Sequence, residues 1–148
     1  MNYIDRDTYG MYKGSNTLHL SGVGVHQGPG PQLMGADTLN GNDVYNLKDE
    51  KLGEIKEIML DVPSGQVSYA VLSCGGFMGL GEKLFAVPWN ALSLDTKNKR
   101  FVLKADKGRL ELAPGFDKNH WPDMADPSWV QDIHAYYGTQ PLSSGPQH

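Results

Sequence analysis

Hydrophobic residues between Gly35 and Ala105 occur in short runs, and turn-forming residues separate these runs about every eight to twelve positions. This spacing is typical of a small β-barrel or β-sandwich. The pattern therefore predicts a mainly β core of six short strands. The predicted strands are Asp43–Asn46, Gly53–Val62, Val67–Cys74, Leu84–Val87, Ala91–Asp95 and Phe101–Ala105.

The second predicted strand has an irregular alternation. Ile58, Leu60 and Val62 fall on one face of the strand, but Ile55 is out of phase with them. A β-bulge near Lys56-Glu57 restores the phase, and bulges are common where a small barrel bends. We therefore expect this strand to bend.

Three other strands indicate their positions in the sheet. Val67–Cys74 is apolar on both faces, which predicts a central strand or one beneath a second layer. Pro88 follows Leu84–Val87 and has no N–H for a ladder, so that strand is expected at an edge or to end there. In the last strand, Phe101 and Leu103 are expected to face inward.

Two short helices are expected after the strands. Asp106 is a candidate N-cap for a helix through Leu112, which Pro114-Gly115 would stop. The second helix has clearer signals, because Asp126 can cap it and Pro127 occupies its first position. Its apolar stripe is formed by Trp129, Ile133, Tyr136 and Tyr137, and Gly138 terminates it.

The two ends of the chain lack a strand or helix pattern. Residues 1–35 hold nine of the 27 Gly and Pro residues and are expected to form a flexible, irregular arm. Three tyrosines in the arm leave docking onto a neighbouring subunit open as an alternative. We therefore expect an arm at 1–35, the barrel at 36–116, an aromatic and helical extension at 117–138, and a disordered tail at 139–148.

Charge and composition exclude several classes of protein. The chain has 13 basic and 17 acidic residues and a net charge of −4, which argues against a dedicated nucleic-acid binder. Cys74 is the only cysteine, so it allows neither an internal disulfide nor a cysteine-based zinc site. The first residues do not form a secretion signal, and no stretch approaches the ~20 apolar residues of a membrane span. We expect a soluble cytoplasmic protein without membrane insertion.

The glycine-rich loop Gly75–Lys83 is a candidate binding feature. Phosphate-binding glycine loops lead from a strand into a helix, whereas this loop joins two predicted strands and has Glu82 before its lysine. We therefore expect no nucleotide cofactor here. Phe77, Met78 and Leu80 instead form an apolar loop tip, which is a candidate contact for a partner.

Acidic and histidine side chains gather at Asp117, His120, Asp123 and Asp126. Catalytic zinc usually takes three protein ligands on regular elements, whereas this stretch has one histidine and two prolines. Helix capping and solvent exposure account for most of the cluster, so no metal is expected. Cys74 and Ser73 also lack the sequence context of a catalytic nucleophile. The sequence therefore predicts no catalytic residues, and an enzyme using Asp117, His120 and Asp123 with a metal stays as an alternative.

A basic stripe lies between Lys97 and Arg109, where six of the 13 basic residues fall within thirteen positions. The stretch Asp43–Asp61 opposes it with six acids and three lysines. Solvation of two barrel faces explains this pattern simply. The alternative is a polar docking surface for a protein, for a second copy of the chain, or for RNA, with Arg100 and Lys104 as contacts.

Residues 36–116 resemble the PRC-barrel family, a module shared by the reaction-centre H subunit of photosynthesis and the ribosome-maturation factor. The order of short motifs carries the resemblance: Asp43-Val44-Tyr45-Asn46 with the Asp49–Gly53 turn, Gly53–Asp61, Val67–Ser73, Lys83–Trp89 with its Val-Pro ending, and Ala91–Leu94. The resemblance implies a small, highly bent six-stranded β-barrel used for assembly, with no catalytic residues or cofactor to transfer.

The expected function is that of a non-catalytic protein-interaction module that associates with itself as a homodimer. An uncovered strand edge and apolar loops favour a second subunit as cover for a small core. The expected contacts are the loop residues Phe77, Met78 and Leu80 and the aromatic residues Trp121, Trp129 and Tyr136. The alternatives are an RNA- or ribosome-associated adaptor that uses the basic stripe, and the metal-dependent enzyme.

Overall fold

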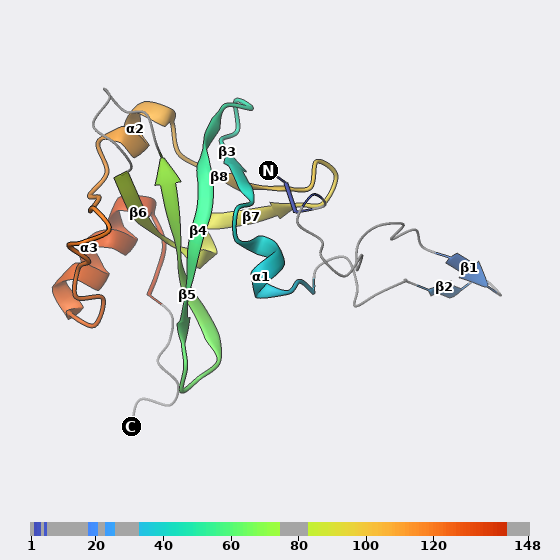
Figure 1. The fold of residues 1–148 in the computed structure, drawn as a ribbon, viewed down its shortest axis with the longest axis horizontal. Coiled ribbons are helices and arrows are strands. Elements are labelled where there is room, and N and C mark those ends of the chain that lie inside the picture. The colour runs from blue at the N-terminus through green and yellow to red at the C-terminus, as the bar shows by residue number, and fades with distance from the viewer. Residues whose placement is uncertain are drawn as a thin grey trace.

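The computed structural model describes residues 2, 3, 5, 18–20, 23–25, 33–74 and 83–141 of the 148-residue chain. It contains a six-stranded sheet that curls into a half-barrel, with three short helices beside it and a separate pair of strands near the N-terminus (Figure 1). The strands are β1 (Leu18–Leu20), β2 (Val23–Val25), β3 (Asp43–Tyr45), β4 (Lys51–Asp61), β5 (Gln66–Cys74), β6 (Lys83–Pro88), β7 (Leu92–Asp95) and β8 (Arg100–Leu103). The helices are α1 (Ala36–Leu39), the 3₁₀ turn η1 (Trp89–Ala91), α2 (Lys107–Glu111) and α3 (Pro127–Tyr137).

The six predicted strands are confirmed, with shifts of a few residues at their ends. Their order in the sheet is β6-β5-β4-β3-β8-β7, and every pair is antiparallel except β3 with β8. Among the described residues, no ladder joins β6 to β7, and η1 crosses between them. The curled sheet therefore keeps an open seam along β7.

The predicted bend in β4 is confirmed. The register against β5 shifts between Ile55 and Glu57, which leaves Lys56 as the bulged residue. A second shift follows between Met59 and Leu60. Such bulges increase the local twist of a strand, so β4 can follow the curl of the sheet.

The end of the β4–β5 hairpin differs from the sequence expectation. Leu60 and Val62 were expected to share a face with Ile58, yet they are 51% and 77% exposed. The reason is that β3 pairs with β4 only as far as Glu54, and β6 pairs with β5 only as far as Tyr69. The hairpin therefore extends beyond its neighbouring strands, as Figure 1 shows.

Strand β5 is buried on both faces, as its sequence predicts. Ala70, Leu72 and Cys74 belong to the main core inside the curl, which also includes Phe85 and Phe101. On the other face, the ring of Tyr69 meets that of Trp129 on α3 edge to face, at 5.2 Å between centroids. The core thus has a main layer inside the sheet and a second layer under α3.

The outer edge of β6 is covered by a later segment of the chain. Leu84 and Phe116 exchange backbone hydrogen bonds of 2.9 and 2.8 Å. Pro88 is the last residue of β6, so both alternatives predicted for this proline hold: the strand is at an edge and ends there. The covered β6 edge contrasts with the open edge at β7.

Helix α3 has the predicted bounds and caps. The side chain of Asp126 accepts a hydrogen bond from the Ser128 amide at 3.0 Å, and Pro127 occupies the first turn. Gly138 ends the helix with φ of 69°, in the left-handed region. Asp106 occupies the N-cap position of α2, but its side chain makes no capping hydrogen bond.

The N-terminal arm contains structure that the sequence pattern did not predict. Strands β1 and β2 form an antiparallel pair. Tyr3 is buried, and its backbone amide lies 3.4 Å from the carbonyl oxygen of Lys99. None of the helices in the described parts of the chain is long and apolar enough to pass through a lipid bilayer.

Candidate interaction surfaces

An apolar groove lies along the open seam of the sheet. Its volume is about 630 Å³. The lining residues come from η1, β7 and β8, from the β4–β5 hairpin at Ile58 and Val67, and from α1 with the two residues Leu33 and Met34 before it. The lining residues are Leu33, Met34, Ala36, Leu39, Ile58, Val67, Trp89, Leu92, Ser93, Leu94 and Phe101.

The local sequence explains why this groove is apolar. Leu92 and Leu94 alternate on β7 and are partly buried, while Ser93 between them is exposed. The ring of Trp89 packs against Phe101 with centroids 5.6 Å apart. Because β7 pairs only with β8, these side chains line a recess that no further strand of the described residues covers.

Charges of opposite sign lie on the elements that line the groove. Glu57 and Asp61 are exposed on the hairpin side, together with Lys56. On the β7 side, Lys97 is exposed in the turn that follows Asp95. The Asp95 carboxylate accepts the backbone amides of Lys97 and Asn98 at 3.1 Å each, which fixes this turn.

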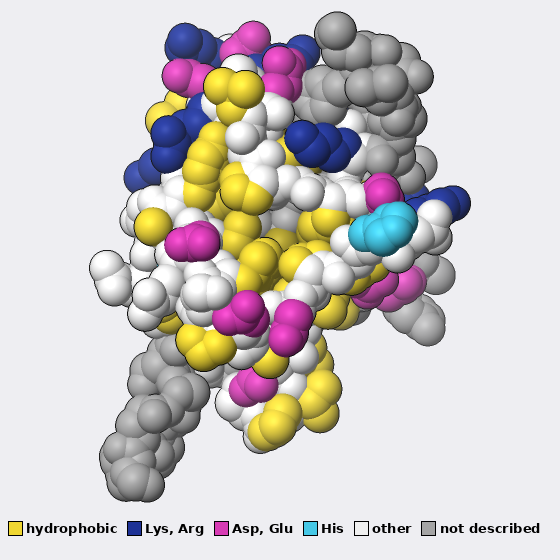
Figure 2. Space-filling model, turned by 90° about the vertical axis from the view of Figure 1, so that its left-hand side faces the viewer, with side chains coloured by type: hydrophobic (Ala, Val, Ile, Leu, Met, Phe, Trp, Pro, Cys, Tyr) yellow, Lys and Arg dark blue, Asp and Glu magenta, His cyan; other side chains and the backbone are white. Residues whose placement is uncertain are grey.

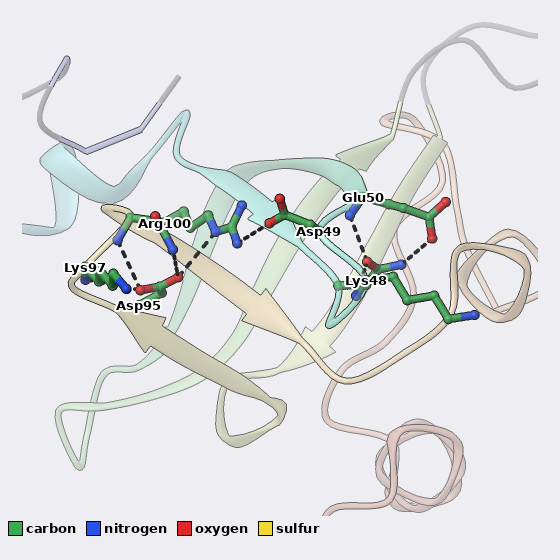
Figure 3. Close-up of polar contacts among 8 residues, drawn as sticks. Lys48, Asp49, Glu50, Asp95, Lys97 and Arg100 are labelled. Carbon is green, nitrogen blue, oxygen red and sulfur yellow. Dashed lines mark hydrogen bonds and ion pairs between the residues drawn. The ribbon is translucent and has the colours of Figure 1, made fainter.

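Two arginines of the basic stripe are engaged within the chain. Figure 3 shows Arg100 between Asp95, at the end of β7, and Asp49, in the turn before β4. The guanidinium also lies 4.2 Å from the ring centroid of Tyr45. Hydrogen bonding from Asn98 and Arg100 lowers the pKa of Asp95. Arg100 therefore joins three segments of the sheet.

Arg109 has a similar structural role on the helical side. Its guanidinium lies 4.4 Å from the ring centroid of Tyr136 and donates to the Tyr136 carbonyl oxygen. In return, the Tyr136 hydroxyl donates to the Arg109 carbonyl oxygen. Lys104, by contrast, is exposed. Within the stripe, Lys99 and Arg100 are half-buried, whereas the other basic residues, Arg109 included, are exposed.

The predicted aromatic contacts gather beside α3. Trp129 is partly buried against Tyr69, and Tyr136 is partly buried beneath Arg109, so both hold α3 to the sheet. Trp121 is 42% exposed and packs against Phe116 at 4.9 Å between ring centroids. Figure 2 shows hydrophobic side chains across this face with acidic side chains near them. A recess of about 50 Å³ lies there, beside Phe116 and Trp129.

The acidic and histidine cluster is only partly assembled. The Asp117 carboxylate lies 2.8 Å from His120 Nδ1, and hydrogen bonding from His120 lowers the pKa of Asp117. Asp123 instead accepts the Ala125 amide, and Asp126 caps α3. Within the described ranges, no group of three or more His, Cys, Asp or Glu side chains is placed to hold a metal ion.

Two buried titratable groups lie in the core. Cys74 is 2% exposed, and burial raises the pKa of its thiol to about 12. His134 on α3 is 4% exposed, and burial lowers its pKa. Its Nε2 lies 3.5 Å from the Tyr69 hydroxyl, and its Nδ1 lies 2.8 Å from the Thr139 hydroxyl oxygen. Both groups belong to packed structure.

The remaining predicted contacts, Phe77, Met78 and Leu80, lie outside the described residues. The groove itself was missed by sequence reasoning. Leu92 and Leu94 carried the available signal, because their alternation on a strand predicts one apolar face. That signal does not reveal that the strand is an uncovered edge.

Comparison with models of protein families identifies the fold. A sequence model of the PRC-barrel domain matches residues 31–110, which is more than half of the chain. The matched range extends from the rim of the groove at Leu33 through the whole six-stranded sheet and into α2. The search of curated proteins found no match.

Proposed function

Since this chain belongs to the PRC-barrel domain family, we propose that it is a non-catalytic assembly module that binds proteins, including a second copy of itself. The groove of about 630 Å³ at the open seam carries this proposal. Apolar recesses beside an unpaired strand edge favour association, because both the edge and the recess gain stability when a partner covers them.

The exposed apolar side chains beside the groove support the same function. Leu33 is 68% exposed at one end of it, and Leu60 and Val62 are exposed on the adjoining hairpin. A small domain has a limited core, so burial of such residues by a second subunit is a substantial gain in stability. We also place the module in the cytoplasm, where its single buried Cys74 requires no disulfide partner.

Sedimentation velocity of the full chain tests this function. We expect a reversible shift from monomer to dimer as the concentration rises from about 1 to about 100 μM, the range typical of modest interfaces. A single species with the 16.3 kDa mass of one chain at every concentration would contradict the self-association.

RNA binding is less well supported than protein binding. Arg100 and Arg109, the residues best suited to bidentate phosphate contact, are engaged by Asp49, Asp95 and Tyr136. The exposed Lys104 provides the cleaner test. If the stripe binds RNA, affinity falls steeply with salt and falls further in a Lys104→Glu variant. Binding that neither salt nor this variant changes would exclude that role.

A further inference from the structure

The groove and the end of the β4–β5 hairpin form one continuous surface. Ile58 and Val67 belong to the hairpin and also line the groove. Further along the same hairpin, Leu60 is 51% exposed and Val62 is 77% exposed. A projecting apolar tip and an apolar recess therefore lie next to each other on one side of the molecule.

The hairpin tip does not fill the groove of its own chain. Val62 lies two residues beyond Leu60, whose cross-strand partner Val67 lines the groove, and this corresponds to about 7 Å along an extended strand. Its exposure also shows that the described parts of the chain leave it uncovered. Val62 thus lies just beyond the recess that its own hairpin helps to line, and it stays exposed there.

A tip beside a recess is the arrangement that a two-fold dimer requires. In such a dimer the same patch on both subunits must be self-complementary, so each projection needs a matching recess nearby. When two copies face each other about a two-fold axis, the tip of each lies at the groove of the other. One contact made twice then covers both apolar features.

The charges around the two features are complementary. Asp61, the last residue of β4, is exposed beside the turn and gives the hairpin tip a negative charge. The turn beyond Leu94, at the end of the groove wall, presents Lys97 to solvent. In the reciprocal arrangement the acidic tip of one copy approaches the basic turn of the other, which favours this orientation and disfavours tip against tip.

We infer that the groove is occupied by the β4–β5 hairpin tip of a second copy, with Leu60 and Val62 of each subunit packed against Leu92, Leu94 and Trp89 of the other. This inference rests on the proposed self-association and names its surface and its partner. Three other exposed large hydrophobic residues, Leu47, Leu112 and Trp121, lie on other segments of the chain and have no place in this contact.

Cysteine cross-linking of the full chain tests the contact directly. Val62→Cys and Ser93→Cys each change an exposed residue, one on the tip and one in the groove wall. The native Cys74 does not interfere, because it is buried and its thiol has a pKa of about 12. The two single variants are mixed, with the Ser93→Cys protein labelled with ¹⁵N, and are treated with a short bismaleimide.

We expect an isotopically mixed covalent dimer in at least tenfold excess over the product of a matched control. The control mixes Ser93→Cys with Leu112→Cys, because Leu112 is 85% exposed and outside the surface.

If the wild-type chain sediments as a dimer but the two mixtures cross-link equally, the reciprocal contact is wrong while self-association stands. If the double variant Val62→Cys/Ser93→Cys links only within one chain, the hairpin folds into its own groove and the inference is also wrong. A wild-type chain that stays monomeric contradicts both proposals.

Discussion

Gly53 is a residue whose identity the structure explains completely. A Cβ atom at this position would lie 2.5 Å from the Ser73 carbonyl oxygen and 2.8 Å from Cys74 Sγ. The first contact is with backbone, which cannot move aside as a flexible side chain does. Gly53 therefore allows β4 and β5 to approach closely at the start of the curl.

Replacement of Gly53 tests this close approach. We expect Gly53→Ala to lower the free energy of unfolding by about 1–3 kcal/mol, because the added methyl group forces a shift of the strands. The matched control is Gly108→Ala in α2, where an added Cβ meets nothing within 4 Å. The control should be neutral or raise stability by up to about 1 kcal/mol. Equal effects of the two changes in urea denaturation would contradict this explanation.

The Cys74 thiol should be inert in the folded protein. It is 2% exposed and its pKa is raised to about 12 by burial, so little thiolate is present or accessible at neutral pH. We expect a thiol reagent such as iodoacetamide to label Cys74 at least 100-fold more slowly in buffer than in 6 M guanidinium. Labelling at similar rates in both solutions would show that the end of β5 is open.

At the scale of elements, α3 is held to the sheet by contacts that depend on a neutral histidine. His134 is a buried residue of α3 that lies near Tyr69 of β5, and burial lowers its pKa below the ordinary value. Its Nδ1 lies close to the Thr139 hydroxyl just beyond the helix end. Protonation adds a charge to this buried site and weakens the packing of α3.

The pH dependence of stability follows from this shift. The unfolded chain takes up a proton at His134 near pH 6.5, whereas the folded chain takes it up only at lower pH. The free energy of unfolding should therefore fall as the pH drops below about 6.5. The contribution of His134 to this fall ends once the pH is below the pKa of His134 in the folded protein. When the free energy of unfolding is measured by urea denaturation between pH 5 and 8, its dependence on pH should be weaker in His134→Gln than in the wild type. An unchanged slope in that variant would assign the pH dependence to other groups.

The sequence predicted those elements whose signals are local. The strand series, the bulge at Lys56 and the caps of α3 at Asp126 and Gly138 each follow from residues close together in the chain. The exposure of the end of the β4–β5 hairpin could not be predicted from the sequence. The alternation at this end matches that of a buried strand, and only the lengths of β3 and β6 decide that nothing covers it.

The candidate surfaces show the same limit. Arg100 was identified as a contact from its place in a basic stripe, but the fold brings it to Asp49, 51 positions earlier in the chain. The groove combines residues from Leu33 to Phe101, so no single motif could reveal it. Sequence patterns locate faces of strands, whereas the pairing of distant elements decides which faces stay open.

At the scale of the whole molecule, the main feature is a sheet that curls without closing. One edge, β6, is covered by the segment around Phe116, and the other edge, β7, borders an apolar groove. Single domains protect such edges from uncontrolled pairing, and a defined second subunit is one way to do so. We therefore regard the open seam as the part of the fold that serves assembly.

The most direct measurement of this account is the molar mass in solution by light scattering, compared among three full-length proteins. At high micromolar concentration we expect the wild-type chain and Leu112→Glu to give twice the 16.3 kDa chain mass. Val62→Glu, which changes a side chain that is 77% exposed and outside the core, should give the mass of one chain while keeping its thermal stability at low concentration. A wild-type monomer, or a Val62→Glu protein that remains fully dimeric, would contradict the account.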